Sequence, residues 1–159
     1  MFFDRIEKDK DFFDYYNVTN PEDVMEIAVT RAKNYLHEAT ARLVIDTAPD
    51  IGFKIVTTTT NEEEQESFED DLTEQEKFIL VSLMYEYYLG RDISYLKTLD
   101  VNYTSSDLRV FDPSNARRTF MEMYENICIQ NRILLDRYKN TDRLTGKLKT
   151  LNFDLYDIV

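Results

Sequence analysis

The stretch FILVSLMYEYYL, residues 78–89, would be apolar almost all the way round if it formed an α-helix. A helix start is marked just before it by TEQE, residues 73–76. This is a capping box, in which the Thr hydroxyl and the Glu carboxylate each accept from a backbone amide that has no other partner. Gly90 follows and is a typical helix stop. The pattern predicts a helix packed on several sides, either within its own domain or against a neighbouring subunit.

A second long helix is predicted to begin at Asn20 and Pro21, because Asn is a good N-cap and Pro suits the first helical position. It should end near Thr47, since Pro49 disfavours helical backbone at the residue before it. Apolar residues recur at helical spacing along one face: Val24, Ile27, Ala28, Ala32, Tyr35, Leu36, Ala39 and Leu43.

A third long helix is predicted to open at Asp112 and Pro113 and to fade near Asn140. The apolar residues of its core face are Ala116, Phe120, Met123, Tyr124, Ile127, Leu134, Leu135 and Tyr138. Ile129 and Ile133 fall on the opposite side. A helix with two apolar faces has two neighbours, and the second can belong to another chain. We therefore predict that Ile129 and Ile133 lie in a subunit interface.

Residues 52–71 lie between the predicted helix that ends near Thr47 and the one that follows the capping box at residues 73–76. We predict that they form an extended, acidic insertion. β-branched and aromatic residues from Phe53 to Thr60 favour a strand. Residues 65–69 could return as the second arm of a short hairpin, or the partner strand could come from another subunit. Residues 61–71 carry seven acidic side chains without the ligand spacing or the obligatory Gly of a calcium loop. We expect this part to be a solvated tip.

The two ends of the chain are apolar without a long helical pattern. Residues 1–19 form an N-terminal arm with aromatic clusters that include Phe12 and Phe13. This arm can lie as a short helix over the core, or Phe12 and Phe13 can anchor on a neighbouring chain as interface residues. The C-terminal tail, residues 141–159, should be extended, and either tucked against its own domain or donated to a partner.

Together these elements predict a mainly α fold. The architecture is a helical bundle of three long helices with a short β-hairpin or extended insertion and an extended C-terminal tail. A chain of 159 residues fits one domain. We place that helical domain at residues 20–140.

The charge, the cysteine count and the hydropathy of the sequence disfavour several classes of protein. The net charge is −12, from 31 acidic and 19 basic residues. This balance disfavours a DNA-coating or membrane-surface role, because both surfaces are anionic. Cys128 is the only cysteine, so no intramolecular disulfide can form. The first residues lack the apolar run of a signal peptide, and no stretch reaches the roughly 18 apolar residues of a membrane span. We expect a soluble, intracellular protein.

The sequence contains no recognisable catalytic, cofactor-binding or metal-binding constellation. His37, the only histidine, falls on the polar face of the helix that begins at Asn20, and Cys128 falls beside a core face. Three glycines cannot supply a glycine-rich phosphate loop. We therefore expect no enzyme activity, no cofactor and no metal.

Two adjacent cations, Arg117 and Arg118, oppose the helix dipole in the first turn of the last long helix. They can pair locally, with Asp107, Asp112 or Glu122. Alternatively, they can contact DNA or an acidic neighbouring subunit. We include Arg117 and Arg118 among the predicted interface residues.

The order of these elements resembles that of the bacteriophage head–tail connector proteins, also called adaptor or head-completion proteins. Residues 71–89 and 111–138 carry most of the likeness, which extends over roughly residues 20–140. The similarity is one of pattern: a long helix, an extended insertion, an apolar helix, a loop, a long last helix and a tail. The aromatic arm and the acidic insertion depart from that pattern.

This resemblance implies a structural virion protein, made in the host cytoplasm and located in the neck between head and tail. It implies a homo-oligomeric ring, dodecameric, beneath the portal protein and above the next neck or tail-completion protein. DNA would pass through the ring without specific binding, since a negatively charged wall neutralises few phosphates. In that family the tail commonly reaches the portal, which implies portal contacts for Phe153, Leu155, Tyr156, Ile158 and Val159.

The main alternative is a small acidic inhibitor or DNA mimic, whose carboxylates stand in for phosphates and bind a basic nucleic-acid enzyme. It predicts a monomer or dimer with salt-sensitive binding to a basic protein. The connector interpretation predicts a large ring, or a monomer that assembles only on its portal.

Overall fold

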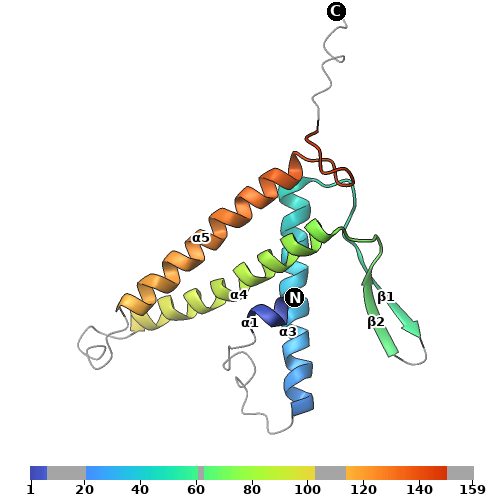
Figure 1. The fold of residues 1–159 in the computed structure, drawn as a ribbon. Helices are drawn as coiled ribbons and strands as arrows, with labels where there is room; N and C mark the ends of the chain where they lie inside the picture. Colours follow the sequence, from blue (N-terminus) through green and yellow to red (C-terminus); the bar gives the residue numbers. More distant parts are fainter. Residues whose placement is uncertain (7–20, 61–62, 103–113, 150–159) are drawn as a thin grey trace, which may run out of the picture.

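The computed structural model of the chain describes residues 1–6, 21–60, 63–102 and 114–149. Three long helices dominate this part of the chain (Figure 1): α3 (Pro21–Thr47), α4 (Glu74–Asn102) and α5 (Ser114–Lys139). The shorter elements are helix α1 (Phe2–Ile6) and an antiparallel hairpin of β1 (Ile55–Thr60) and β2 (Glu63–Phe68). The predicted fold class, a mainly α bundle of three long helices with a short β-hairpin, is confirmed.

Helix α4 begins with the predicted capping box. The Glu76 amide donates to the Thr73 hydroxyl at 3.3 Å, and the Thr73 amide donates to the Glu76 carboxylate at 2.7 Å. Two amides at the start of the helix therefore have partners. The helix accordingly begins where the sequence predicts.

The predicted helix stop at Gly90 is wrong, because α4 continues to Asn102. A Cβ atom at Gly90 would lie 3.4 Å from the hydroxyl of Tyr124 in α5. Tyr124 of α5 thus packs directly against α4 at this point, at a distance that a methyl group would just fill. A glycine inside a helix costs only about 1 kcal/mol relative to alanine, which tertiary packing readily offsets. Gly90 is a site of close helix approach.

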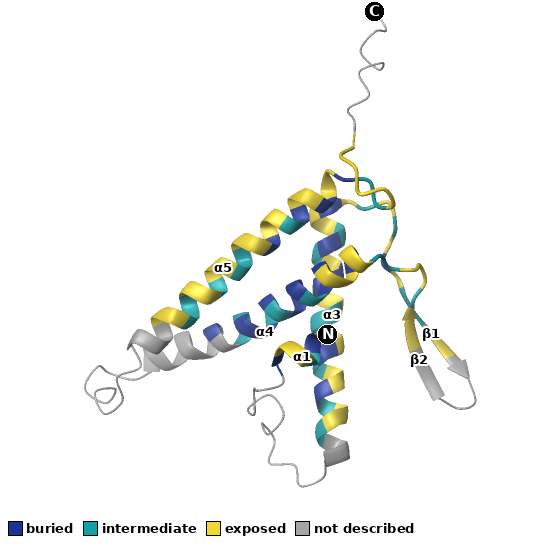
Figure 2. Cartoon of the chain, viewed as in Figure 1, coloured by how far each residue is buried: buried dark blue, intermediate teal, exposed yellow. Residues whose placement is uncertain are grey.

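The apolar surface of α4 is covered largely by helices of the same chain. Its buried apolar residues are Ile79, Leu80, Leu83, Met84, Tyr88, Leu89 and Ile93. The other described residues buried in the same core are Ala28, Ala32, Ala39 and Leu43 of α3, Leu135 and Tyr138 of α5, Phe2 and Ile6 of α1, and Phe53 of the segment before β1. Figure 2 shows these buried positions where the helices face one another. Packing within one domain therefore accounts for the core side of α4.

The first residues of the N-terminal arm lie over this core as the short helix α1. The Phe2 ring centroid is 6.1 Å from that of Tyr35 and 6.5 Å from that of Tyr88. For residues 2–6, the alternative of a short helix laid over the core is confirmed.

The hairpin pairs two strands of the same chain, with Ile55 opposite Phe68 and Thr60 opposite Glu63. Of the two alternatives for the partner strand, the one within the chain is therefore correct. The second arm of the hairpin, predicted at residues 65–69, is β2, which begins two residues earlier, at Glu63, within the part expected to be a solvated tip. The β-branched threonines of β1 favour strand backbone and offer β2 a ladder of hydrogen bonds. The hairpin extends beside α3 (Figure 1), and Glu66 of β2 forms an ion pair with Lys33 of α3 at 3.0 Å.

The segment after α5 folds back in a compact turn, so the prediction of an extended tail from residue 141 onward is wrong for residues 141–149. Thr141 and Leu148 form an antiparallel bridge, and the Lys149 amide donates to the Asn140 carbonyl at 2.8 Å. Gly146 turns the chain with a φ of 66°, a conformation that suits glycine. Local hydrogen bonds thus hold the base of the tail against α5.

Candidate interaction surfaces

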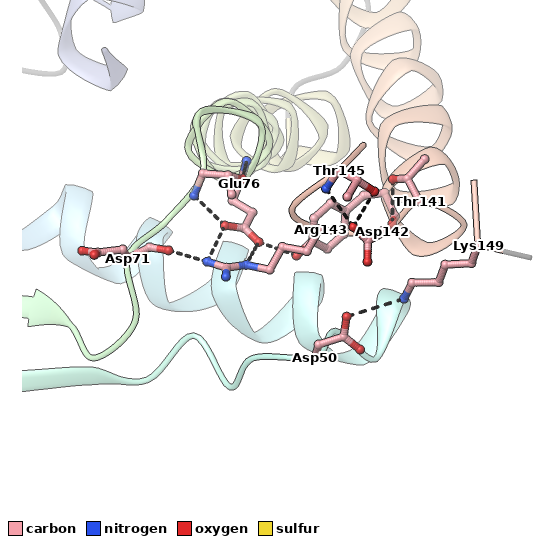
Figure 3. A network of polar contacts seen from close by, with 10 residues as sticks. Asp50, Asp71, Glu76, Thr141, Asp142, Arg143, Thr145 and Lys149 are labelled. Carbon is pink, nitrogen blue, oxygen red and sulfur yellow. Dashed lines mark hydrogen bonds and ion pairs between the residues drawn. The ribbon is translucent and has the colours of Figure 1, made fainter. Parts of the chain in front are cut away.

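Glu76 lies at the junction between the start of α4, the end of α5 and the 141–149 turn (Figure 3). The residue is fully buried, at 0% exposure. Arg143 donates through Nε to Glu76 Oε1 at 2.7 Å, and the Tyr138 hydroxyl donates to the same oxygen at 2.6 Å. Arg143 also donates to the carbonyl of Asp71, at the base of the hairpin. One carboxylate and one guanidinium thus join the helical bundle, the hairpin and the turn that precedes the tail.

The electrostatics of Glu76 are those of a structural ion pair. Burial alone would raise its pKa, but hydrogen bonds from Arg143, Tyr138 and Thr73 outweigh burial and lower the pKa from 4.5. Burial raises the pKa of Tyr138, and the hydrogen bond to Glu76 raises it further, so the hydroxyl stays protonated as a donor. A general acid needs a raised carboxyl pKa. Glu76 has the opposite shift.

A second polar cluster, made of Arg42, Ser82, Glu86, Cys128 and Asn131, joins α3, α4 and α5. Asn131 is 1% exposed, donates to Glu86 Oε2 at 2.7 Å and accepts from the Ser82 hydroxyl at 2.6 Å. Arg42 donates to Glu86 Oε1 at 2.7 Å. Shifting α5 by one turn would leave these buried groups without partners. The cluster therefore fixes the register of α5 in the bundle.

The described polar side chains show no metal centre: among these residues, no group of three or more His, Cys, Asp or Glu could hold an ion. His37 is exposed on α3, on the polar face predicted for it. Cys128 is half-buried and donates to Glu86 at 3.4 Å. Burial is the main cause that raises the pKa of its thiol. Cys128 therefore behaves as a packed residue of the α4–α5 contact.

The outer face of α5 exposes two large apolar side chains. Ile129 is 58% exposed and Ile133 is 60% exposed, one helical turn apart, whereas Leu135 of the same helix is 4% exposed. Figure 2 shows the exposed positions along this side of α5. The prediction that Ile129 and Ile133 lie opposite the core is confirmed. No described part of the chain covers them, and their role in an interface stays a prediction.

The predicted charge contact of Arg118 is local in the structure. Its Nε donates to Glu122 Oε1 at 2.8 Å, one turn along α5, and both side chains are exposed. Of the alternatives for this residue, pairing with Glu122 is the one observed. The side chain of Arg117 lies outside the described residues, so its role as an interface residue stays a prediction.

An open cleft with a volume of about 560 Å³ lies between the three long helices. Three tyrosines line it, Tyr35, Tyr87 and Tyr124, together with Arg31 and Arg91. Tyr and Arg are enriched in protein–protein interfaces. The sequence pattern did not indicate this cleft, because its lining residues come from three helices that are far apart in the sequence: four from α3, four from α4 and one from α5.

Several predicted site residues lie outside the described part of the chain. These are Phe12 and Phe13 of the arm and the predicted portal contacts Phe153, Leu155, Tyr156, Ile158 and Val159. Conversely, two residues that the structure brings to the centre were not predicted as important. Glu86 interrupts an apolar run, which was an available signal, whereas Asn131 gave no signal in the sequence.

Comparison with protein-family models, curated proteins and solved structures gives no match for this chain. Among the described residues, no helix combines the length and the hydropathy that crossing a membrane requires.

Proposed function

We propose that this chain is a structural virion protein that forms a ring beneath the portal and joins the DNA-filled head to the tail. The subunits are identical, twelve to a ring, and they line a channel through which DNA passes without specific binding. The protein is made in the host cytoplasm and resides in the neck of the virion. Its other partners are the portal protein and the next neck or tail-completion protein.

The observation that carries this proposal is the second apolar face of α5. Ile129 and Ile133 are more than half exposed on a helix whose opposite face is buried in the core. Exposed apolar patches with polar surroundings mark interaction sites on proteins. The polar residues around it, Glu125, Arg132 and Arg137, are exposed and give this patch such a rim. A neighbouring subunit would bury the two isoleucines.

The charge of the chain supports a channel role. The net charge is −12, and a wall with few cations releases few counterions from DNA, so DNA binds weakly to it. The Glu76–Arg143 junction supports a role for the tail. It anchors the turn at residues 141–149 to the bundle, so the residues that follow start from a fixed point.

The proposal is tested by binding to the portal protein encoded in the same genome. We expect the full chain to bind the portal as a ring. Removal of residues 151–159 should weaken that binding at least about tenfold without changing the unfolding midpoint. A matched control keeps the length of the tail and replaces its five predicted contact residues with Ser, and it should weaken binding as much. Unchanged binding after truncation would refute the tail contact, and no portal binding by the full chain would refute the proposed function.

One observation favours the alternative, an acidic inhibitor or DNA mimic. Glu69, Asp70 and Asp71 at the end of the hairpin are all exposed, and residues 61–71 carry seven acids without a base. Such a run can imitate a phosphate backbone for a basic enzyme. A monomer that binds a basic nucleic-acid enzyme and ignores the portal would favour this alternative.

A further inference from the structure

The outer face of α5 is a strip of exposed side chains with the two isoleucines at its middle. Ile129 and Ile133 are 58% and 60% exposed, and Figure 2 shows exposed positions along this side of the helix. At 3.6 residues per turn, six charged side chains fall within about 80° of the line through the two isoleucines. All six are exposed: Arg118, Glu122, Glu125, Arg132, Asp136 and Arg137. We call these residues, together with the two isoleucines, the α5 strip.

The charges of the α5 strip balance one another, and its two halves carry net charges of opposite sign. Before Ile129 the strip has one base and two acids, a net charge of −1, and after Ile129 it has two bases and one acid, a net charge of +1. A strongly acidic or strongly basic partner gains little from such a surface. A second copy turned end for end fits it best, because each half then faces the half of opposite sign.

The positions of the charges agree with one antiparallel register. Glu125 lies four residues before Ile129 and Arg132 lies three residues after it. In an antiparallel pair centred on Ile129, Glu125 of each copy is therefore level with Arg132 of the other to within about 1.5 Å, the rise of one residue. The same register brings two further pairs of opposite charge to within about 6 Å along the helix axis: Glu122 with Arg137, and Arg118 with Asp136. A parallel pair would instead place like charges at the same level.

We propose that, before it meets the portal, the chain forms a two-fold dimer in which two copies of α5 pack antiparallel around Ile129. Ile129 of one copy meets Ile129 of the other beside the two-fold axis, and Ile133 is covered by the facing helix. Packed helices have axes about 8–10 Å apart. At that separation the long side chains of Arg132 and Glu125 meet across the edge of the contact.

The contact is small. From Arg118 to Arg137 the α5 strip is about 29 Å long at ~1.5 Å per residue, and a helix with its side chains is about 10 Å wide. The footprint is therefore about 300 Å² on each copy, below the ~800 Å² per partner of a stable interface. We expect a weak dimer, with a dissociation constant on the order of 100 μM.

The dimer and the ring compete for the same two isoleucines. A two-fold contact uses the same surface on both copies, so it is closed and does not extend into a ring or a filament. The dimer therefore keeps free chains out of rings, and because it is weak, contacts on the portal can replace it. This role in assembly rests on the proposed function, whereas the dimer itself does not.

The dimer is tested by analytical ultracentrifugation of the full chain without the portal. A salt concentration of about 0.15 M screens charges beyond ~8 Å and so reduces the general repulsion between two acidic chains. The wild type should show a monomer–dimer equilibrium between about 10 μM and 1 mM. Ile129→Asp should weaken dimerisation at least about tenfold, because it places two carboxylates beside the two-fold axis. Ile45→Asp is the matched control and should dimerise like the wild type, because Ile45 is 79% exposed but lies on α3.

A charge swap tests the register. Glu125 and Arg132 are exposed and form no ion pair among the described residues, so replacing them should leave the unfolding midpoint unchanged. Glu125→Arg alone and Arg132→Glu alone each set like charges opposite one another twice, and each should weaken dimerisation about tenfold. The chain that carries both substitutions regains opposite charges in both pairs and should dimerise like the wild type. Glu26→Arg, at an exposed position on α3, controls for the change in net charge.

Three results would overturn the dimer. They are a wild type that stays monomeric up to about 1 mM, a single charge variant that dimerises as well as the wild type, and a double variant that dimerises no better than the single ones.

The role in assembly is tested with Ile129→Cys, whose thiols lie beside the two-fold axis and can be joined as a disulfide by glutathione disulfide. The linked dimer should form no portal-bound rings, and reduction should restore them. The wild type is the control and should not become linked, because its Cys128 is half-buried. Rings formed equally well by the linked dimer would refute the role in assembly. A wild type that dimerises but never binds the portal would refute the proposed function and leave the dimer standing.

Discussion

Arg143 reaches across 67 residues of sequence to the fully buried carboxylate of Glu76, with Nε 2.7 Å from Oε1. The same carboxylate closes the capping box of α4 through the Thr73 amide. A group that caps one helix therefore also holds the turn that follows another. This ion pair fixes the start of the tail to the bundle, together with the weaker pair of Lys149 with Asp50 at 3.9 Å.

Arg143→Ala should destabilise the fold by about 3–5 kcal/mol, because it leaves a buried carboxylate without its cation. Chemical denaturation at neutral pH measures the loss. Arg118→Ala is the matched control, since Arg118 forms an exposed pair with Glu122, and it should cost about 1 kcal/mol or less. Equal losses for the two variants would show that the Glu76 junction carries no special stability.

Stability should fall in acid partly through Glu76. Its pKa is lowered in the folded state from 4.5, so the folded state binds this proton less well than the unfolded state. The contribution of Glu76 is therefore complete above about pH 4.5 and is lost as the pH falls through the folded pKa. Glu76→Gln removes the titration. The difference in unfolding free energy between the wild type and Glu76→Gln should shrink as the pH is lowered, and a constant difference would contradict this.

Asn131→Ala should destabilise the bundle by about 1–3 kcal/mol, because Ser82 and Glu86 lose a buried partner. Asn126→Ala, an exposed position on the same helix, should change stability by less than about 0.5 kcal/mol. Thermal unfolding gives the melting temperatures of both variants, and that of Asn131→Ala should be the lower. Similar melting temperatures would mean that the cluster does not fix α5.

Gly90→Ala should raise the unfolding free energy by about 0.5–1 kcal/mol, since alanine favours helix and its Cβ would meet the Tyr124 hydroxyl at an ordinary contact distance of 3.4 Å. Gly90→Leu should destabilise the fold, because the larger side chain displaces Tyr124. If Gly90 is a site of close approach, denaturation curves should show a higher free energy of unfolding for Gly90→Ala and a lower one for Gly90→Leu. Destabilisation by both would indicate that even one methyl group does not fit.

Local signals in the sequence predicted the helices well. The capping box at Thr73 and Glu76 placed the start of α4, and the 3.6-residue period placed Ile129 and Ile133 opposite the core, because both depend on residues within a few positions of one another. The stop at Gly90 failed because its reason is tertiary: the ring of Tyr124 packs there from another helix. The local pattern favoured a cap, and packing overrode it.

The polar contacts of Glu76 and Asn131 could not be predicted from the sequence, because they too depend on tertiary packing. The partners of Glu76 lie 62 and 67 residues away, and Asn131 meets Glu86 at a separation of 45 residues. No periodicity encodes such pairings. The acidic run at residues 61–71 was visible as composition, but its division into a strand and a connection depends on β1.

The most direct measurement is cryo-electron microscopy of the purified chain bound to the portal protein encoded in the same genome. We expect a closed ring of twelve subunits beneath the portal, with Ile129 and Ile133 of each subunit buried against its neighbour and a tail reaching the portal. A portal that carries no density for this chain, or a chain that binds only as isolated monomers, would contradict the proposed function.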